Sequence, residues 1–205
     1  MSGPTLVIEL AEALSAAALR EFRSLMAGIS SRCEEERPGF FDVQVPAGRL
    51  GIRVGREPFP TPGFGGATLD EELMDLFGSD PRLAAEHRPF LVYLMGPGAG
   101  DEDVFEAEHE GEAEAEAVLG FRPTHAVNVS ACCNGAVDHQ ATALLTAAVM
   151  DVIGGVANAE LAEGQAAVVA GLPGVLGITD DGYQVLGTAE FLRAWSGQHG
   201  FRLVK

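Results

Sequence analysis

The sequence contains a single lysine, Lys205, only three cysteines, and no apolar run of the about 18 to 20 residues that a membrane-spanning helix needs. The N-terminal MSGPTLVIEL also lacks the basic region and the small-residue cleavage site of a secretion signal. An odd number of cysteines (Cys33, Cys132 and Cys133) argues against a disulfide framework. We therefore expect a cytoplasmic protein with free thiols and no membrane segment.

Positive charge is scarce throughout the chain. The 205 residues include 30 Asp and Glu against 13 Lys and Arg, which gives a formal net charge of −17. A surface of this sign repels nucleic-acid phosphates and anionic membranes, and it attracts basic proteins. The composition therefore predicts no nucleic-acid or membrane partner, and it favours a basic protein as partner.

The length and composition indicate one globular domain over 1–205. The hydrophobic fraction is 47% and the charged fraction is 21%, and both are typical of folded chains. A division into two halves, 1–98 and 120–205, joined by an acidic segment at 99–119, is the alternative organisation. Each half opens with an apolar strand that leads into an apolar helix.

Hydrophobic periodicity predicts the main strands and helices. Strands are expected at 5–10, 90–95, 125–133 and near 156–161. Helices are expected at 15–29, with Ser15 as N-cap, at 138–153, and from Thr188 onward. The strand at 125–133 should be central, and the helix at 138–153 should be mostly buried because apolar side chains occupy nearly all of its circumference.

Hairpins and loops complete the expected organisation. Alternating apolar residues predict a hairpin between 40–46 and 49–55, and the turn signal Asp180–Gly182 predicts another within 175–187. The charged CEEERPG (33–39) and the Pro- and Gly-rich stretch 58–66 are predicted as loops, with short helical pieces at 69–77 and 81–87. Hairpins with helices between them imply an α+β fold, in which helices cover a mixed, largely antiparallel sheet.

An acidic run from Asp101 to Glu116 is the least ordinary feature of the chain. It holds nine carboxylates, no Lys or Arg, and one histidine, His109; the carboxylates are Asp101, Glu102, Asp103, Glu106, Glu108, Glu110, Glu112, Glu114 and Glu116. Carboxylates without cations are costly to bury, so we expect the run to be exposed and either helical or mobile. It is either a solvated surface or a docking surface for a basic partner. It lacks the alternating ligands and the turn glycine of an EF-hand loop.

The junction between the strand at 125–133 and the following helix gathers reactive side chains: Cys132, Cys133, Asn134, Asp138 and His139. A thiolate stabilised by the helix N-terminus, with His139 as its base, would make a small thiol-dependent enzyme. The structural alternative makes Asp138 the N-cap of the helix and places His139 in an exposed first turn.

The remaining motifs exclude common cofactor sites. No CxxC or HxxxH spacing occurs, which argues against zinc. GPGAG (96–100) lacks the lysine of a phosphate-binding loop and the third glycine of a dinucleotide fingerprint, and the acidic run follows it directly. The sequence predicts neither a metal nor a cofactor.

Three features, CNGAVDH (133–139), the paired glycines after its helix and the ending AEFLRAWSGQHGFRLVK, are similar to a mainly actinobacterial family of domains of unknown function. The resemblance covers about the C-terminal 80 residues, and the opening PTLVIEL more weakly. It implies a protein of the immunity type: small, acidic, α+β and without enzyme motifs. No catalytic role is carried over to Cys133, Asn134, Asp138 or His139.

Three functional hypotheses follow. The first is an acidic binding protein, such as an immunity-type inhibitor of a basic toxin or another cationic partner. The second is a thiol-dependent enzyme that uses Cys132 or Cys133 with His139. The third is a structural or regulatory module without a ligand.

Overall fold

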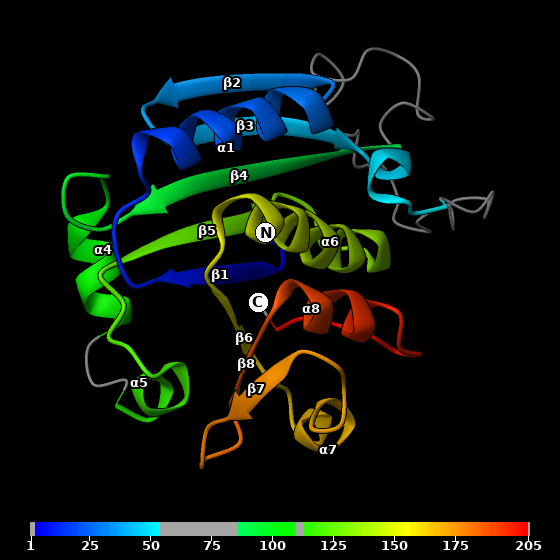
Figure 1. Ribbon diagram of the computed structural model, residues 1–205. Helices are drawn as coiled ribbons and strands as arrows, with labels where there is room; N and C mark the ends of the chain where they lie inside the picture. Colours follow the sequence, from blue (N-terminus) through cyan, green and yellow to red (C-terminus); the bar gives the residue numbers. More distant parts are fainter. Residues whose placement is uncertain (1–2, 54–85, 110–112, 205) are drawn as a thin grey trace, which may run out of the picture.

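An eight-stranded sheet forms the centre of the computed structural model, which describes residues 3–53, 86–109 and 113–204 (Figure 1). The strand order is β2-β3-β4-β5-β1-β6-β8-β7. The strands are β1 (Thr5–Leu10), β2 (Arg32–Arg37), β3 (Phe40–Pro46), β4 (His87–Met95), β5 (His125–Ala131), β6 (Val156–Glu160), β7 (Val175–Ile178) and β8 (Gln184–Gly187). All pairings among these strands are antiparallel, so the α+β prediction is confirmed without the parallel pairs that a mixed sheet would contain.

Helices cover the two faces of the sheet unequally. Figure 1 shows α1, α6 and α8 side by side on the near face. The helical segments are α1 (Ala16–Ile29), the 3-10 helix η1 (Ala47–Leu50), α4 (Glu102–Glu108), α5 (Ala113–Leu119), α6 (Ala136–Ile153), α7 (Gln165–Val169) and α8 (Ala189–Ser196). Of the other helices, α4 contacts β4, and α5 contacts β7 and β8. Among the described helices, only α4 and α5 are thus left to cover part of the face opposite α1, α6 and α8.

Side-chain alternation explains how the sheet divides its residues between these faces. In β1, Leu6, Ile8 and Leu10 are buried in the main core beneath the helices. Val7 instead packs into a second, smaller cluster, and Glu9 lies on the same face as Val7. A strand that reads as continuously apolar thus directs a carboxylate to the face that carries α4.

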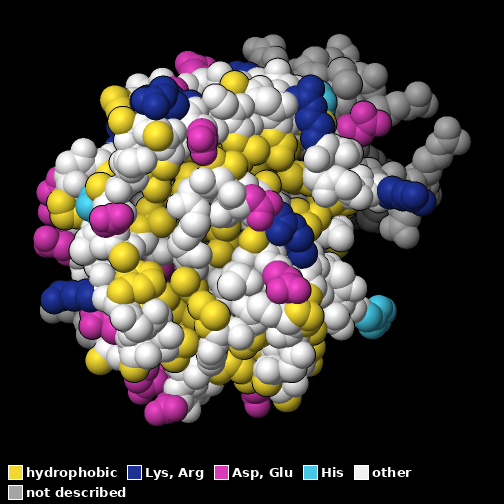
Figure 2. Space-filling model, in the orientation of Figure 1, with side chains coloured by type: hydrophobic (Ala, Val, Ile, Leu, Met, Phe, Trp, Pro, Cys, Tyr) yellow, Lys and Arg dark blue, Asp and Glu magenta, His cyan; other side chains and the backbone are white. Residues whose placement is uncertain are grey.

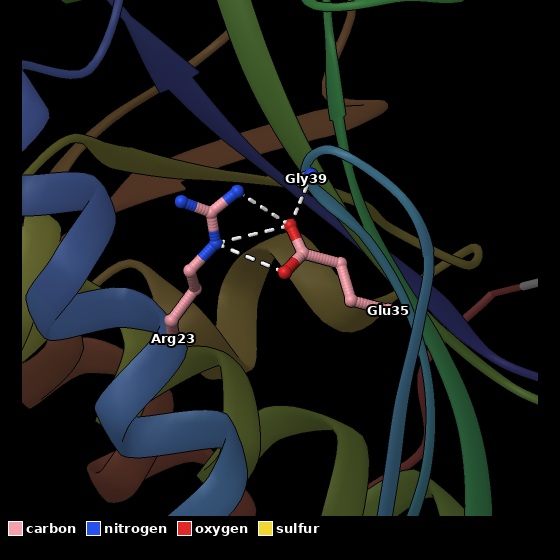
Figure 3. A network of polar contacts seen from close by, with 3 residues as sticks. All are labelled: Arg23, Glu35 and Gly39. Carbon is pink, nitrogen blue, oxygen red and sulfur yellow. Dashed lines mark hydrogen bonds and ion pairs between the residues drawn. The ribbon is translucent and has the colours of Figure 1, made fainter.

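Helix α1 is fixed at its start and along its side. The backbone N–H of Ala18 donates to Ser15 Oγ at 3.1 Å, which confirms Ser15 as the N-cap. Arg23 Nε donates to both carboxylate oxygens of Glu35 on β2, at 3.0 and 2.9 Å, and Glu35 Oε1 also accepts from the Gly39 N–H at 2.9 Å (Figure 3). This network lowers the pKa of Glu35, mainly through the bond from Arg23, and it ties α1 to the β2–β3 hairpin.

The prediction of a loop at 33–39 is wrong, because Arg32–Arg37 form the edge strand β2. Its residues RCEEER are almost all exposed, so they carry no hydrophobic period, yet they pair with β3. The predicted hairpin between 40–46 and 49–55 is wrong, because β3 pairs with β2 and β4 and residues 49–53 form no strand; residues 54–55 lie outside the described part of the chain. Residues 47–50 form η1, which ends at Gly51 with φ +77°, and Ile52 is buried without belonging to a strand.

The strand at 125–133 and the helix at 138–153 are largely as predicted. β5 lies between β4 and β1, and α6 buries most of its residues. Two details differ from the prediction. The N-cap of α6 is Gly135, whose N–H donates to Asp138 Oδ2 at 2.6 Å, and His139 is buried rather than exposed. Cys132 and Cys133 lie beyond the end of β5.

The C-terminal part follows the sequence closely. β6 and the β7–β8 hairpin occupy the predicted positions, and α8 begins after Thr188. The predicted loop at 58–66 and helical piece at 69–77 lie outside the described residues. So does most of the piece at 81–87, whose last residue begins β4.

Candidate functional site

The acidic run folds into α4 and α5 against the less covered face of the sheet. Phe105 anchors α4, since it is 6% exposed and packs with Met95 and Ala126, with Val7 and Tyr93 beside them. In the described part of the run, most carboxylates face away from this anchor. The expectation of exposed, helical acidic segments is confirmed there.

A buried carboxylate lies beneath the end of α4. Glu9 is 1% exposed, and its Oε2 is 2.8 Å from His109 Nε2. Its other oxygen, Oε1, accepts from Asn158 Nδ2 at 3.1 Å. His109 Nδ1 is 2.7 Å from the Phe105 carbonyl oxygen, and the two rings stack with centroids 4.1 Å apart. The acidic run is therefore attached to the sheet through its one histidine.

Next to this pair is a hollow of about 260 Å³, which we call the polar hollow. It is lined by Thr5, Val7, Glu9, Glu108, His109, Asn128, Asn158, Glu160, Gln184 and Val204. Its floor comes from the alternate residues of β1, β5, β6 and β8, and its wall comes from the end of α4. Three of these side chains are carboxylates, and no Lys or Arg is among the described residues that line the hollow.

A second hollow of about 480 Å³, which we call the acidic hollow, lies between α5 and the β7–β8 turn. It is lined by Glu114, Ala115, Glu160, Leu161, Thr179, Asp181, Tyr183 and Gln184. Tyr183 is 67% exposed at this site. The Thr179 hydroxyl (2.6 Å) and the Tyr183 N–H (2.9 Å) donate to Asp181, and both bonds lower the pKa of that carboxyl. The turn thus presents an ionised carboxylate beside an exposed aromatic ring.

The nine carboxylates of the run differ in exposure. Glu102, Asp103, Glu106, Glu108 and Glu114 are exposed, and Asp101 and Glu116 are partly buried. Glu110 and Glu112 lie outside the described residues. Figure 2 shows Asp and Glu side chains along the left edge of the molecule, where α4 lies in Figure 1, and few Lys and Arg side chains on the face in view.

Some of these carboxylates are already paired with groups from elsewhere in the chain. Arg37 of β2 pairs with Asp101, and Arg122 Nε is 3.6 Å from Glu116. Glu102 accepts from the Gly98 N–H at 2.7 Å. The run by itself suggested nine carboxylates without cations, but the fold brings two arginines to its ends. Within the described chain, Asp103, Glu106 and Glu114 form no ion pair.

The residues proposed for thiol chemistry have other roles in the structure. Asp138 is buried, and its carboxylate accepts a hydrogen bond from the Gly135 N–H and forms an ion pair with Arg88 Nη1 at 3.2 Å. His139 Nδ1 accepts from the backbone N–H of Leu203 at 3.2 Å, so this nitrogen fixes the C-terminal segment.

Neither thiol at this junction is activated. Burial raises the pKa of Cys132 to about 11, with further contributions from Asp42, Cys133 and Asp138. Burial and then Asp138 raise the pKa of Cys133, and Arg88 offsets only part of this effect. A nucleophilic thiolate needs the opposite shift. All three cysteines are free, as their odd number led us to expect.

Sequence reasoning missed the buried centre of the site. Glu9, Asn128 and Asn158 sit on three predicted strands whose polar residues were given no role by the sequence analysis. The signal was present, because each of these polar residues is the direct neighbour of an apolar core residue in its strand. Neighbouring residues of a strand point to opposite faces of the sheet. The partner of Glu9 was not visible locally, since His109 lies 100 residues further along the chain.

The described residues set two further boundaries on the function of the site. No group of three or more His, Cys, Asp or Glu side chains there is arranged to hold a metal ion. No described helix has both the length and the apolar character needed to cross a membrane.

Fold and site together define an α+β protein whose antiparallel sheet carries three helices on one face and an acidic helical segment on the other. A model of a family of unknown function, DUF6368, matches residues 2–205, and the chain belongs to this family. The resemblance to a domain of unknown function is thereby confirmed, and it extends over nearly the whole chain. The comparisons with curated proteins and with solved structures gave no match.

Proposed function

We propose that this chain is an acidic binding protein that docks a basic protein partner on the surface around α4, α5 and the acidic hollow. The observation that carries the proposal is the acidic hollow itself, where Glu114, Glu160 and Asp181 surround the exposed Tyr183 and none of the described lining residues is Lys or Arg. Exposed tyrosines are enriched at binding hot spots, and their rings also attract Lys and Arg side chains.

Charge supports the same surface. Asp103 and Glu106 of α4 line a further hollow of about 760 Å³ between α4 and α5, and Arg122 is the one Lys or Arg among its described lining residues. Together with the overall net charge of −17, this surface would accelerate the approach of a basic protein. In its specific form, the proposal is an immunity-type inhibitor that neutralises a basic toxin. The three free cysteines support a cytoplasmic setting for this interaction.

A pair of charge-matched variants tests the proposal. The first neutralises three unpaired carboxylates of the surface, by Asp103→Asn, Glu106→Gln and Glu114→Gln. The control removes the same charge from three exposed carboxylates on other elements, by Glu12→Gln, Glu21→Gln and Glu190→Gln. Both variants have the same net charge, so any difference between them reports the position of the charge.

The partner is first captured from the native host at low and at high salt, and its association rate is then measured at two salt concentrations. We expect the surface variant to associate on the order of ten-fold more slowly at low salt, with a weaker salt dependence, and the control to stay close to the wild type. Equal rates for the two variants would mean that recognition lies elsewhere. Inhibition of a toxic activity of the captured protein tests the immunity role separately.

No observation favours the thiol enzyme as a second function. The raised pKa values of Cys132 and Cys133 and the structural bonds of Asp138 and His139 give it no support. A module without a ligand corresponds to the outcome in which no basic protein is captured.

A further inference from the structure

The contact between His109 and Glu9 requires a proton. Nδ1 of His109 faces the carbonyl oxygen of Phe105 at 2.7 Å, and a carbonyl oxygen can only accept, so this nitrogen must carry its hydrogen. A neutral imidazole then has a bare lone pair on Nε2, which lies 2.8 Å from Glu9 Oε2. A hydrogen bond exists at this distance only if one further proton lies between Nε2 and Oε2.

The contact needs this proton whether it is bound to His109 Nε2 or to Glu9 Oε2. Either His109 is an imidazolium beside a carboxylate, or a neutral ring accepts from a protonated Glu9. In either case Glu9 Oε1 accepts from Asn158 Nδ2. In both cases the pair binds one proton more than a neutral ring facing an ionised carboxylate. Without that proton, two electron-rich atoms face each other in a buried site.

We propose that the proton shared by His109 and Glu9 is a latch that holds the C-terminal end of α4 on the sheet and closes one wall of the polar hollow. Loss of the proton releases His109 and Phe105 together, because the two rings stack and the Phe105 carbonyl holds Nδ1. Release opens the hollow toward Asn128 and Asn158 on its floor. The inference does not depend on the proposed partner.

Other charged groups surround the latch and set its environment. On the polar hollow side, Glu108 of α4 and Glu160 of β6 face the pair. On the side between α4 and α5, the hollow that His109 shares is also lined by Asp103, Glu106, Glu116 and Arg122. These groups are predominantly negative, so they favour retention of the proton.

The sign of the pH dependence follows from proton binding. The attached state binds the extra proton and the released state does not hold it, so attachment is stable below the pH at which the pair titrates and weakens above it. Above that point, the equilibrium for opening moves about ten-fold per pH unit.

Hydrogen exchange of the full chain measures attachment directly. The reporters are the amides of Phe105, which bonds to the Asp101 carbonyl, and of His109, which bonds to the Phe105 carbonyl. Protection factors, corrected for the intrinsic rate at each pH, should fall about ten-fold per pH unit once the pair titrates. The amide of Gly154, bonded to Met150 at the end of α6, should show no such change.

Three variants separate the latch from general electrostatics. In Glu9→Gln, the new amide can donate to a neutral Nε2 and still accept from Asn158, so the loss of protection at high pH should disappear. In His109→Gln, the titrating ring is absent, and protection should be independent of pH. Glu160→Gln removes another carboxylate of the same hollow, so it should still lose protection at high pH, with the onset moved to lower pH because one group that favours the proton is gone.

The outcomes decide between the latch and a merely structural contact. Constant protection of α4 in the wild type while the His109 ring titrates by NMR would overturn the proposal. An unchanged loss of protection in Glu9→Gln would overturn it too. If His109→Gln fails to fold, the comparison of Glu9→Gln with Glu160→Gln still provides the test.

Discussion

Replacement of Gly155 by alanine should destabilise the protein by about 2 to 5 kcal/mol. Gly155 follows α6 with φ +90°, where an alanine costs about 1 to 2 kcal/mol because its Cβ approaches the following carbonyl. That Cβ would also lie 2.6 Å from Ile8 Cγ2 and 2.8 Å from the Glu9 carbonyl oxygen. Overpacking against a strand backbone adds about 1 to 3 kcal/mol, because β1 is fixed between two neighbouring strands.

Gly164→Ala provides the matched control. Its φ is +84°, but a Cβ there meets no atom within 4 Å, so it should cost only the conformational part, about 1 to 2 kcal/mol. Urea unfolding of both variants, followed by the fluorescence of the buried Trp195, gives the two changes in the free energy of unfolding. If both variants lose the same stability, the close approach of Gly155 to β1 has no energetic cost, and the reasoning from the contact distances is wrong.

Three further measurements test the fold and the thiols. Leu145→Ala should cost about 2 to 5 kcal/mol in the same urea assay, since Leu145 is fully buried in α6, and a change within 0.5 kcal/mol would contradict that packing. Alkylation of Cys132 should accelerate about ten-fold per pH unit up to about pH 11, and a plateau near pH 9 would contradict its raised pKa. We also propose that residues 1–205 unfold as one domain, which predicts one transition for probes in both halves.

Elements with a strong hydrophobic pattern were predictable from the sequence. β5 and α6 bury apolar residues that recur over seven and 18 positions, so local periodicity was sufficient to find them. The β7–β8 hairpin carried its own turn signal at Asp180–Gly182. The edge strand β2 was missed because both of its faces meet solvent, and its stability comes from pairing with β3 and from Arg23 on α1. Neither contribution leaves a local pattern.

The candidate site was predictable only in part. The acidic run is visible as composition, and exposure follows from the cost of burying carboxylates. Its attachment to the sheet is a tertiary contact between His109 and Glu9, which no local rule predicts. The prediction that His139 is exposed was wrong for a similar reason. The N–H of Leu203, 64 residues further along the chain, donates to a ring nitrogen that the helix alone would have left to solvent.

The position of β1 has a consequence for synthesis on the ribosome. Strand β1 is made long before its partners, because it pairs with β5, which begins at His125, and with β6, which begins at Val156. At about 5 to 20 residues per second, β1 waits on the order of ten seconds for those segments to be translated. During that interval the apolar side chains of Leu6, Ile8 and Leu10 lack their partner strands, which makes the nascent β1 segment a natural substrate for chaperones.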